Sequence, residues 1–253
     1  MKAFQSYEVS IKSKPALTKN ERLWSTPLNF SMQTLPTGNE KIDQKLIKIC
    51  FFSVPFSPKS SMSAFMVTDF LNSSRLVTFY WRKQSEDEKN GPNFRYIIDN
   101  SEETTAPYKE KIIDESKDIV FNISAVNDVG YSEAVFTMAV PSEEERQKLA
   151  EVNESILIDN HGEFMVIWNY KENLPTNTIV TIFWCARSSD RHCGNGIKWK
   201  ERTVDENKFA IPQDQGLINY AFTSITQDNR TKGMNIVPCR LSLGKGHIKT
   251  YFY

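Results

Sequence analysis

The clearest signal in the chain is a regular alternation of apolar and polar residues between positions 118 and 141. A two-residue period of this kind is typical of a strand that buries one face. The alternation stops at a turn, 127–130, where Gly130 can adopt the positive φ that a side chain resists. A second alternating segment then runs back to Pro141. We therefore predict a β-hairpin that closes a domain. The apolar positions of its first strand are Ile119, Phe121, Ile123 and Ala125.

The same alternation recurs elsewhere and predicts an all-β protein made of repeated units. Residues 1–36 repeat the closing hairpin of a domain. Before the 118–141 hairpin we expect strands at 66–70, 76–82 and 94–98. After it we expect strands at 155–158, 163–169, 178–185, 197–202, 217–226 and 234–241. Trp81, Trp168 and Trp184 each lie in an apolar strand and are predicted to be core residues.

These segments divide the chain into four parts. Residues 1–36 are interpreted as the last two strands of a truncated module, and 37–62 as a linker. Residues 63–141 and 142–253 are predicted to be two complete β-sandwich modules, since 253 residues can bury several separate cores. In the last module we place Tyr220 and Phe222 on the inner face. Ser224 and Thr226 then share that face, where their hydroxyls need partners.

Charge and hydropathy argue against several classes of protein. Lysine plus arginine equals aspartate plus glutamate at 31 each, so there is no basic field to favour nucleic acid. No apolar run approaches the roughly 18 residues that cross a membrane, and the first residues lack the apolar centre of a signal peptide. Read literally, the chain would stay in the cytosol, so the expected truncation matters to its localisation.

The order of residues in the 118–141 hairpin resembles strands F and G of a fibronectin type III module, although that family usually has tyrosine where Ile119 stands. The segment 77–96 resembles the B–C hairpin of class I cytokine receptors. Trp24-Ser25 matches the first half of their Trp-Ser-x-Trp-Ser element, and Lys12 and Lys14 are candidates to stack on Trp24. Phe183-Trp184-Cys185, followed by Cys193 and Trp199, resembles their last modules.

This resemblance implies tandem fibronectin type III sandwiches from the stalk of a class I cytokine receptor. It also implies a helical cytokine bound by the complete receptor, a receptor dimer partner, and a JAK kinase reached only through a missing cytoplasmic part. The chain would lie on the extracellular side of the plasma membrane within a longer single-pass receptor. With two strands of the upper module, the fragment should not bind cytokine tightly by itself.

Two other interpretations remain open. A cell-adhesion or guidance receptor could use the same sandwiches to bind a cell-surface partner. A cytosolic repeat scaffold would instead have free thiols and unmodified asparagines.

The cysteine spacing favours a disulfide. Cys185 and Cys193 flank a loop that is short enough for the Cα separation of about 4.4–6.8 Å found in disulfides. A zinc site made by Cys185, His192 and Cys193 is the alternative, although no fourth ligand is evident nearby. Cys50 and Cys239 have no obvious partner. A disulfide would place the protein outside the cytosol.

Asparagine sequons agree with an extracellular location. Alternation with Phe121 and Ile123 turns Asn122 outward, where it could carry a glycan. The asparagines that begin an Asn-x-Ser/Thr triplet are Asn29, Asn72, Asn122, Asn153 and Asn229.

The sequence offers no support for catalysis. None of the 3 histidines, His161, His192 and His247, lies in a nucleophile motif or has metal-ligand spacing. We therefore expect a binding or structural protein without catalytic residues, cofactor or metal.

Overall fold

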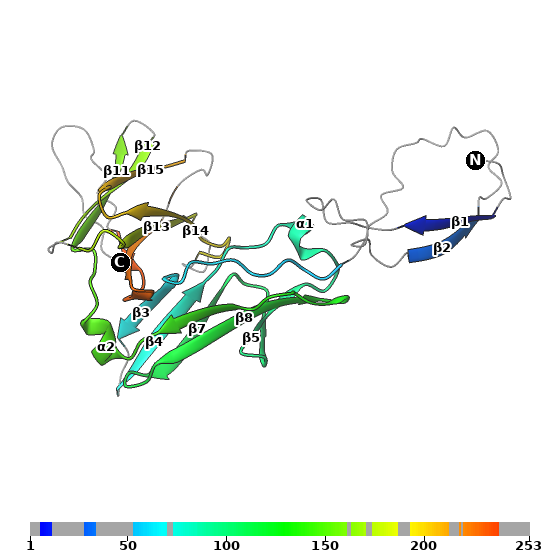
Figure 1. Ribbon diagram of the computed structural model, residues 1–253, viewed down its shortest axis with the longest axis horizontal. Helices are drawn as coiled ribbons and strands as arrows, with labels where there is room; N and C mark the ends of the chain where they lie inside the picture. Colours follow the sequence, from blue (N-terminus) through cyan, green and yellow to red (C-terminus); the bar gives the residue numbers. More distant parts are fainter. Residues whose placement is uncertain are drawn as a thin grey trace. The chain divides into compact units, whose positions relative to one another are not determined.

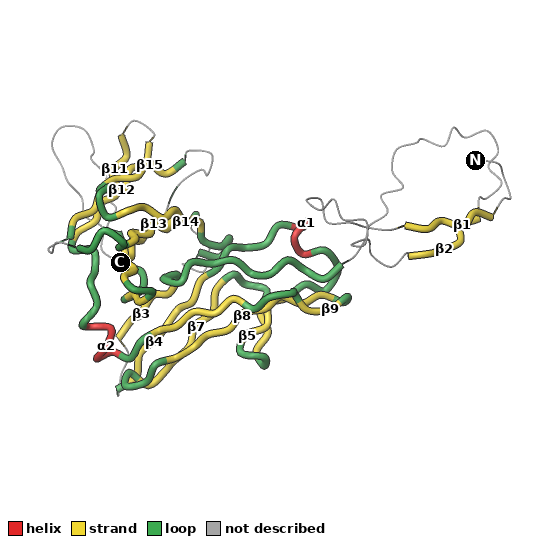
Figure 2. Tube along the Cα trace, viewed as in Figure 1, coloured by secondary structure: helices red, strands yellow, loops and turns green. Residues whose placement is uncertain are grey.

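The computed structural model describes residues 6–11, 28–33, 53–69, 73–160, 163–170, 174–186, 193–212, 218 and 220–237. The chain divides into two compact units, 1–50 and 51–253. In the first unit, β1 (Ser6–Ile11) pairs antiparallel with β2 (Leu28–Gln33), and Val9 lies opposite Phe30. The second unit contains all the other strands and helices of the described residues (Figures 1 and 2).

The middle sandwich consists of two antiparallel sheets. One sheet has the order β3-β4-β7, and the other has the order β10-β8-β5-β6, with β9 paired to β8. A short helix, α1 (Glu86–Lys89), lies between β4 and β5. The strands are β3 (Phe65–Asp69), β4 (Ser74–Tyr80), β5 (Arg95–Ile98), β6 (Glu102–Thr104), β7 (Tyr108–Asp114), β8 (Ile119–Asn127), β9 (Gly130–Tyr131) and β10 (Phe136–Val140).

Aromatic side chains fill the space between these sheets. Phe121 on β8 stacks on Phe79 on β4 with a centroid distance of 3.8 Å. Trp81 meets Tyr96 edge-on at 5.2 Å. Both arrangements join one sheet to the other, so the alternating residues of β8 form the inner face that the sequence predicts.

Part of the predicted linker belongs structurally to this sandwich. The Phe56 N–H donates to the Glu88 carbonyl at 2.9 Å, and the Arg82 N–H donates to the Lys59 carbonyl at 3.0 Å. The Ser60 hydroxyl donates to the Tyr80 carbonyl at 2.7 Å. Residues 53–62 therefore run along the middle sandwich and take part in its hydrogen bonding.

The last sandwich repeats the same strand order. One sheet is β11-β12-β15, and the other is β14-β13-β16, with β17 and β18 both paired to β16. The connector before it contains α2 (Glu143–Gln147). The strands are β11 (Glu154–Asn160), β12 (Glu163–Asn169), β13 (Ile179–Cys185), β14 (Lys198–Thr203), β15 (Lys208–Ile211), β16 (Tyr220–Gln227), β17 (Arg230–Thr231) and β18 (Asn235–Ile236).

The protein is thus all-β, built from tandem fibronectin type III sandwiches. Strands β7 and β15 were not expected from the sequence. In β7, three charged residues follow one another at 109–111 and Ile112 is exposed, so the sequence shows no apolar face, and β15 is only 4 residues long. Both are stabilised by pairing with long neighbours, β4 and β12, so tertiary context rather than local pattern makes them strands. Neither helix in the described part of the chain is long and apolar enough to cross a bilayer.

The predicted facing of β16 is wrong. Ala221 and Ile225 join the core inside the last sandwich, whereas Phe222 joins a different cluster on the opposite face. Ser224 lies on that opposite face with Phe222. A one-residue error in the phase of a strand exchanges its two faces. Both faces of β16 are buried, so its sequence does not indicate which face is the inner one.

Candidate functional site: the junction between the sandwiches

The outer face of the β13–β16 sheet is buried against the middle sandwich. Phe183 on β13 lies opposite both Trp199 on β14 and Phe222 on β16, so these three side chains form a row across one face. We call them the aromatic row. Phe183 is 0% exposed, although it points away from the core of its own sandwich.

The middle sandwich supplies the other half of this contact. Ala64, Phe65 and Tyr80 are buried and belong to the same continuous core as Phe183 and Phe222. We call this contact the junction. A single core that crosses from one sandwich to the next indicates that the two modules are packed together and are not merely strung along a linker.

Hydrogen bonds fix the register of the junction. The Ser224 hydroxyl donates to the Ser63 hydroxyl at 2.7 Å, which provides the partner that the buried Ser224 requires. The Met234 N–H donates to the Phe65 carbonyl, also at 2.7 Å. These directional contacts select one relative placement of the two surfaces, because apolar contact alone has no such preference.

Two glycines let the backbones approach closely at the junction. Gly233 has a φ of +89°, and a Cβ there would lie 2.5 Å from the Phe65 carbonyl oxygen. Gly196 has a φ of +81°, and a Cβ there would lie 2.4 Å from the Lys83 nitrogen. A side chain at either position would be strained and would push the sandwiches apart.

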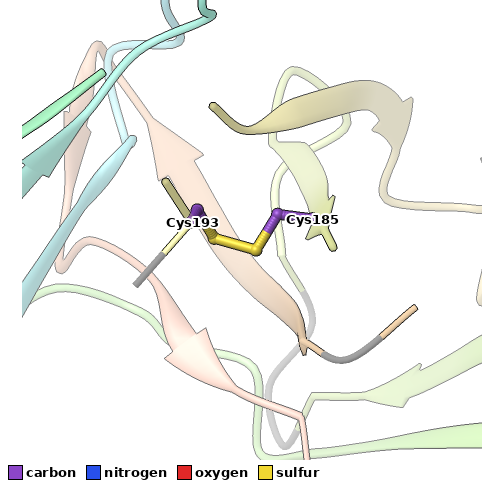
Figure 3. Close-up of a disulfide and its surroundings, with 2 residues drawn as sticks. All are labelled: Cys185 and Cys193. Atoms are coloured by element: carbon purple, nitrogen blue, oxygen red, sulfur yellow. A yellow bond between two sulfur atoms is a disulfide. The ribbon is translucent and has the colours of Figure 1, made fainter. Parts of the chain in front are cut away.

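Cys185 and Cys193 are joined by a disulfide whose Cα atoms are 5.6 Å apart (Figure 3). Both half-cystines are buried in the junction core. The bond ties the end of β13 to the segment that leads to Ile197, whose N–H donates to the Trp81 carbonyl at 3.4 Å. The disulfide therefore supports the junction and not the inner core of the last sandwich. His192, the third member of the alternative zinc site, lies outside the described residues.

The connector between the sandwiches begins at a polar clamp. The Ser142 N–H donates to Asp118 at 2.6 Å, and the buried Arg75 lies 3.8 Å from Glu143. Burial lowers the pKa of the Arg75 guanidinium, an effect that the nearby Glu143 opposes. Hydrogen bonds from Arg146 lower the pKa of Glu143, so this carboxylate stays ionised at neutral pH. The first turn of α2 is thereby held against the middle sandwich.

At the end of the middle sandwich opposite to the polar clamp, one buried asparagine makes hydrogen bonds to several backbone groups. The Asn127 amide group donates to the carbonyls of Ser53 and Lys89 at 2.7 and 2.9 Å. Its oxygen accepts from the N–H groups of Val129 and Gly130 at 2.9 and 3.2 Å. One side chain thus joins the entering chain, the last residue of α1 and the β8–β9 turn.

Replacing Asn127 by alanine should destabilise the middle sandwich by about 1–3 kcal/mol, because buried backbone groups lose their partners. Urea unfolding followed by tryptophan fluorescence would measure this loss. An Asn127→Asp variant is the matched control, because it keeps the acceptor for Val129 and Gly130 but cannot donate. We expect it to be destabilised as well, and wild-type stability in both variants would contradict the assigned role.

The sequons differ in exposure. Asn153 and Asn229 are exposed, and Asn229 lies in the β16–β17 turn with a φ of +59°. Asn122 lies on the outer face of β8 as expected, but it is half-buried and accepts a hydrogen bond from Thr137 at 2.9 Å. Asn72 lies outside the described residues, and for Asn29 only the backbone, in β2, is described.

Several expectations concern residues that are not described. They are the Trp-Ser element, its stacking candidates, two cysteines and two histidines. The residues outside the described part of the chain are Lys12, Lys14, Trp24, Ser25, Cys50, Cys239, His161 and His247. No group of side chains suited to a metal occurs among the residues that are described.

The alternation of apolar and polar residues does not predict the junction, although one signal for it is present in the sequence. The segment 180–185 is apolar or small throughout, a pattern typical of a strand that is buried on both faces. Ser63 and Gly233 carried no such signal, because their partners lie far away in the sequence.

Comparison with known proteins gives one relative. No protein family model matches the chain. A Drosophila melanogaster protein described as "Cytokine receptor" is 22% identical over 253 residues, which cover 93% of this chain and 18% of that protein. The chain therefore spans less than a fifth of the length of the curated relative.

Two solved structures show some likeness to the chain. The FN1–FN3 domains of chicken CNTN1 align with a TM-score of 0.26 and 12% identity, covering 93% of this chain and 76% of that one. The chicken interferon gamma receptor alpha chain aligns with a TM-score of 0.23 and 15% identity, covering 72% of this chain and 96% of that one.

Proposed function

We propose that this chain is part of the ectodomain of a cytokine receptor, in which it serves as a stiff stalk. The observation that carries the proposal is the junction, where two sandwiches share one continuous core. A freely jointed pair of modules would average over many angles, whereas a packed and hydrogen-bonded pair keeps one. A fixed angle is what a receptor needs if an extracellular event is to set the distance between its cytoplasmic parts.

The receptor assignment rests on sequence. The resemblance of 77–96 to the B–C hairpin of class I receptors and the 22% identity to a Drosophila cytokine receptor support the same family. We infer a helical cytokine as ligand of the whole receptor, a dimer partner, and JAK–STAT signalling through a cytoplasmic part. The whole arrangement, including Tyr220-Ala-Phe222 and Lys232-Gly233-Met234, resembles the insect cytokine receptor Domeless, and we propose a receptor of that type.

Loosening the junction should weaken signalling. In a full-length receptor that contains this chain, Gly233→Val should reduce ligand-induced STAT reporter activity at equal surface expression, because the added methyl groups separate the sandwiches at Phe65. Ala139→Val is the matched control, since Ala139 is exposed on β10. An undiminished response in Gly233→Val would contradict the stalk role. A wild-type receptor that never activates the reporter would contradict the receptor assignment itself.

Location outside the cell can be tested separately. We expect a non-reducing peptide map of the chain, secreted behind an added signal peptide, to show the Cys185–Cys193 bond and glycans at Asn122, Asn153 and Asn229. Free thiols and bare asparagines in a folded protein would favour the cytosolic scaffold. An adhesion receptor would give the same map but would not activate the STAT reporter.

A further inference from the structure

The sheet of the last sandwich that faces away from the junction has an apolar outer surface. Leu157, Val166 and Trp168 enter the inner core from β11 and β12. Their neighbours in these strands point to the opposite face, because side chains alternate along a strand. Ile156 lies opposite Ile167, and Ile158 lies opposite Met165. We call the surface formed by Ile156, Ile158, Met165 and Ile167 the outer platform.

The outer platform corresponds, position by position, to the surface that the middle sandwich uses at the junction. Trp81 and Trp168 are equivalent, because each donates its backbone N–H to the residue just before the next strand of the sheet, Pro107 and Asn207 respectively. Counting back one residue makes Tyr80 equivalent to Ile167. Counting back three makes Thr78 equivalent to Met165.

Pairing across the sheet extends the equivalence. Ala64 accepts from the Tyr80 N–H, and Met66 lies opposite Thr78, so these two residues match Ile156 and Ile158. At the junction Ala64 and Tyr80 belong to the core shared with the docked sandwich and are 0% and 2% exposed, Thr78 is also 2% exposed, and Met66 is half-buried. The members of the outer platform are half-buried. A second copy of the docking surface is therefore present, and every one of its four positions carries an aliphatic side chain.

The junction also shows what such a surface binds. Its partner is the outer face of a sandwich sheet with the strand order β14-β13-β16-β17, and this face bears the aromatic row. The equivalent face of the middle sandwich is different, since an Arg95–Glu103 ion pair at 3.0 Å lies at its β5–β6 edge. The aromatic row of the last sandwich is already buried. The described part of the chain therefore offers no free surface of the matching kind.

We propose that the outer platform docks a further sandwich module, the one that follows this module in a longer polypeptide, through an aromatic row on that module's outer sheet face. In the observed junction the docking surface belongs to the earlier module and the aromatic row to the later one. If the same connection is repeated, the outer platform of the last sandwich receives the aromatic row of the module that follows it. The proposal concerns module packing and does not depend on the receptor assignment.

The chain's own aromatic row can serve as the probe. Ala64→Arg places a charge in the junction, so it should release the aromatic row and disable the docking surface of the middle sandwich at once. The row can then dock only on the outer platform of another molecule, a head-to-tail contact that forms open chains. Sedimentation velocity should show a monomeric wild-type chain and concentration-dependent oligomers of the variant.

Substitution on the outer platform decides the result. Adding Ile167→Lys to the Ala64→Arg chain should weaken association at least about tenfold, equivalent to a loss of about 1.4 kcal/mol. Adding Val120→Lys, at an exposed apolar site on the middle sandwich, should leave association unchanged. If Ala64→Arg does not fold by near-UV circular dichroism, Tyr80→Lys opens the same junction.

Three outcomes would overturn the proposal. The first is an opened chain that stays monomeric, and the second is association that Ile167→Lys leaves intact. The third is a wild-type chain that dimerises until Ile167→Lys is introduced, because the outer platform would then bind a second copy of itself.

Discussion

Replacing Phe183 by alanine is expected to uncouple the two sandwiches. Its ring is 0% exposed in the core that both modules share, so truncation should cost about 3–5 kcal/mol, and the loss falls on the contact between them. The wild-type unit should unfold in one cooperative transition. The variant should unfold in two, which differential scanning calorimetry would resolve.

The adjacent residue gives a matched control. Ile182 is also 0% exposed, but it points into the inner core of the last sandwich. Ile182→Ala should lower stability while leaving the junction residues in place. If Phe183→Ala and Ile182→Ala produce the same unfolding profile, the shared core does not couple the modules.

Replacing Trp168 by alanine should unfold the last sandwich and leave the middle one folded. Trp168 is one of the largest fully buried side chains, and removing it should cost about 3–5 kcal/mol through lost contacts and the remaining cavity. The middle sandwich should then melt at a lower temperature than in the wild type, because Tyr80 and Ala64 lose their cover. Hydrogen exchange measured by mass spectrometry would follow both modules separately.

The pattern of protection would test the module boundary as well. We expect lost protection across 154–237 and retained protection in β4 and β8. Equal loss in both sandwiches, or in neither, would contradict a boundary near Ser142. Trp184→Phe, a smaller change in the same core, should produce a weaker version of the same pattern.

The sequence by itself determined the all-β character and the inner faces of those strands that have one polar face. Where one face is polar, alternation gives the strand and its orientation together, and β8 with Phe121 and Ile123 is the clear case. The tryptophans that end apolar strands were recognised as core residues for the same reason. The Cys185–Cys193 pairing followed from a short separation along the chain, which is local information.

Only the tertiary structure decided which face of β16 is inner and what lies against its other side. In the sequence, Ser224 is a polar residue between buried neighbours and has no evident hydrogen-bond partner. The structure provides that partner, the hydroxyl of Ser63, which lies 161 residues away in the chain. Strands β7 and β15 become strands by pairing with long neighbours, and Gly233 has its role because Phe65 lies against it. These features depend on contacts between segments that are distant in the sequence, so a local pattern of hydrophobicity cannot predict them.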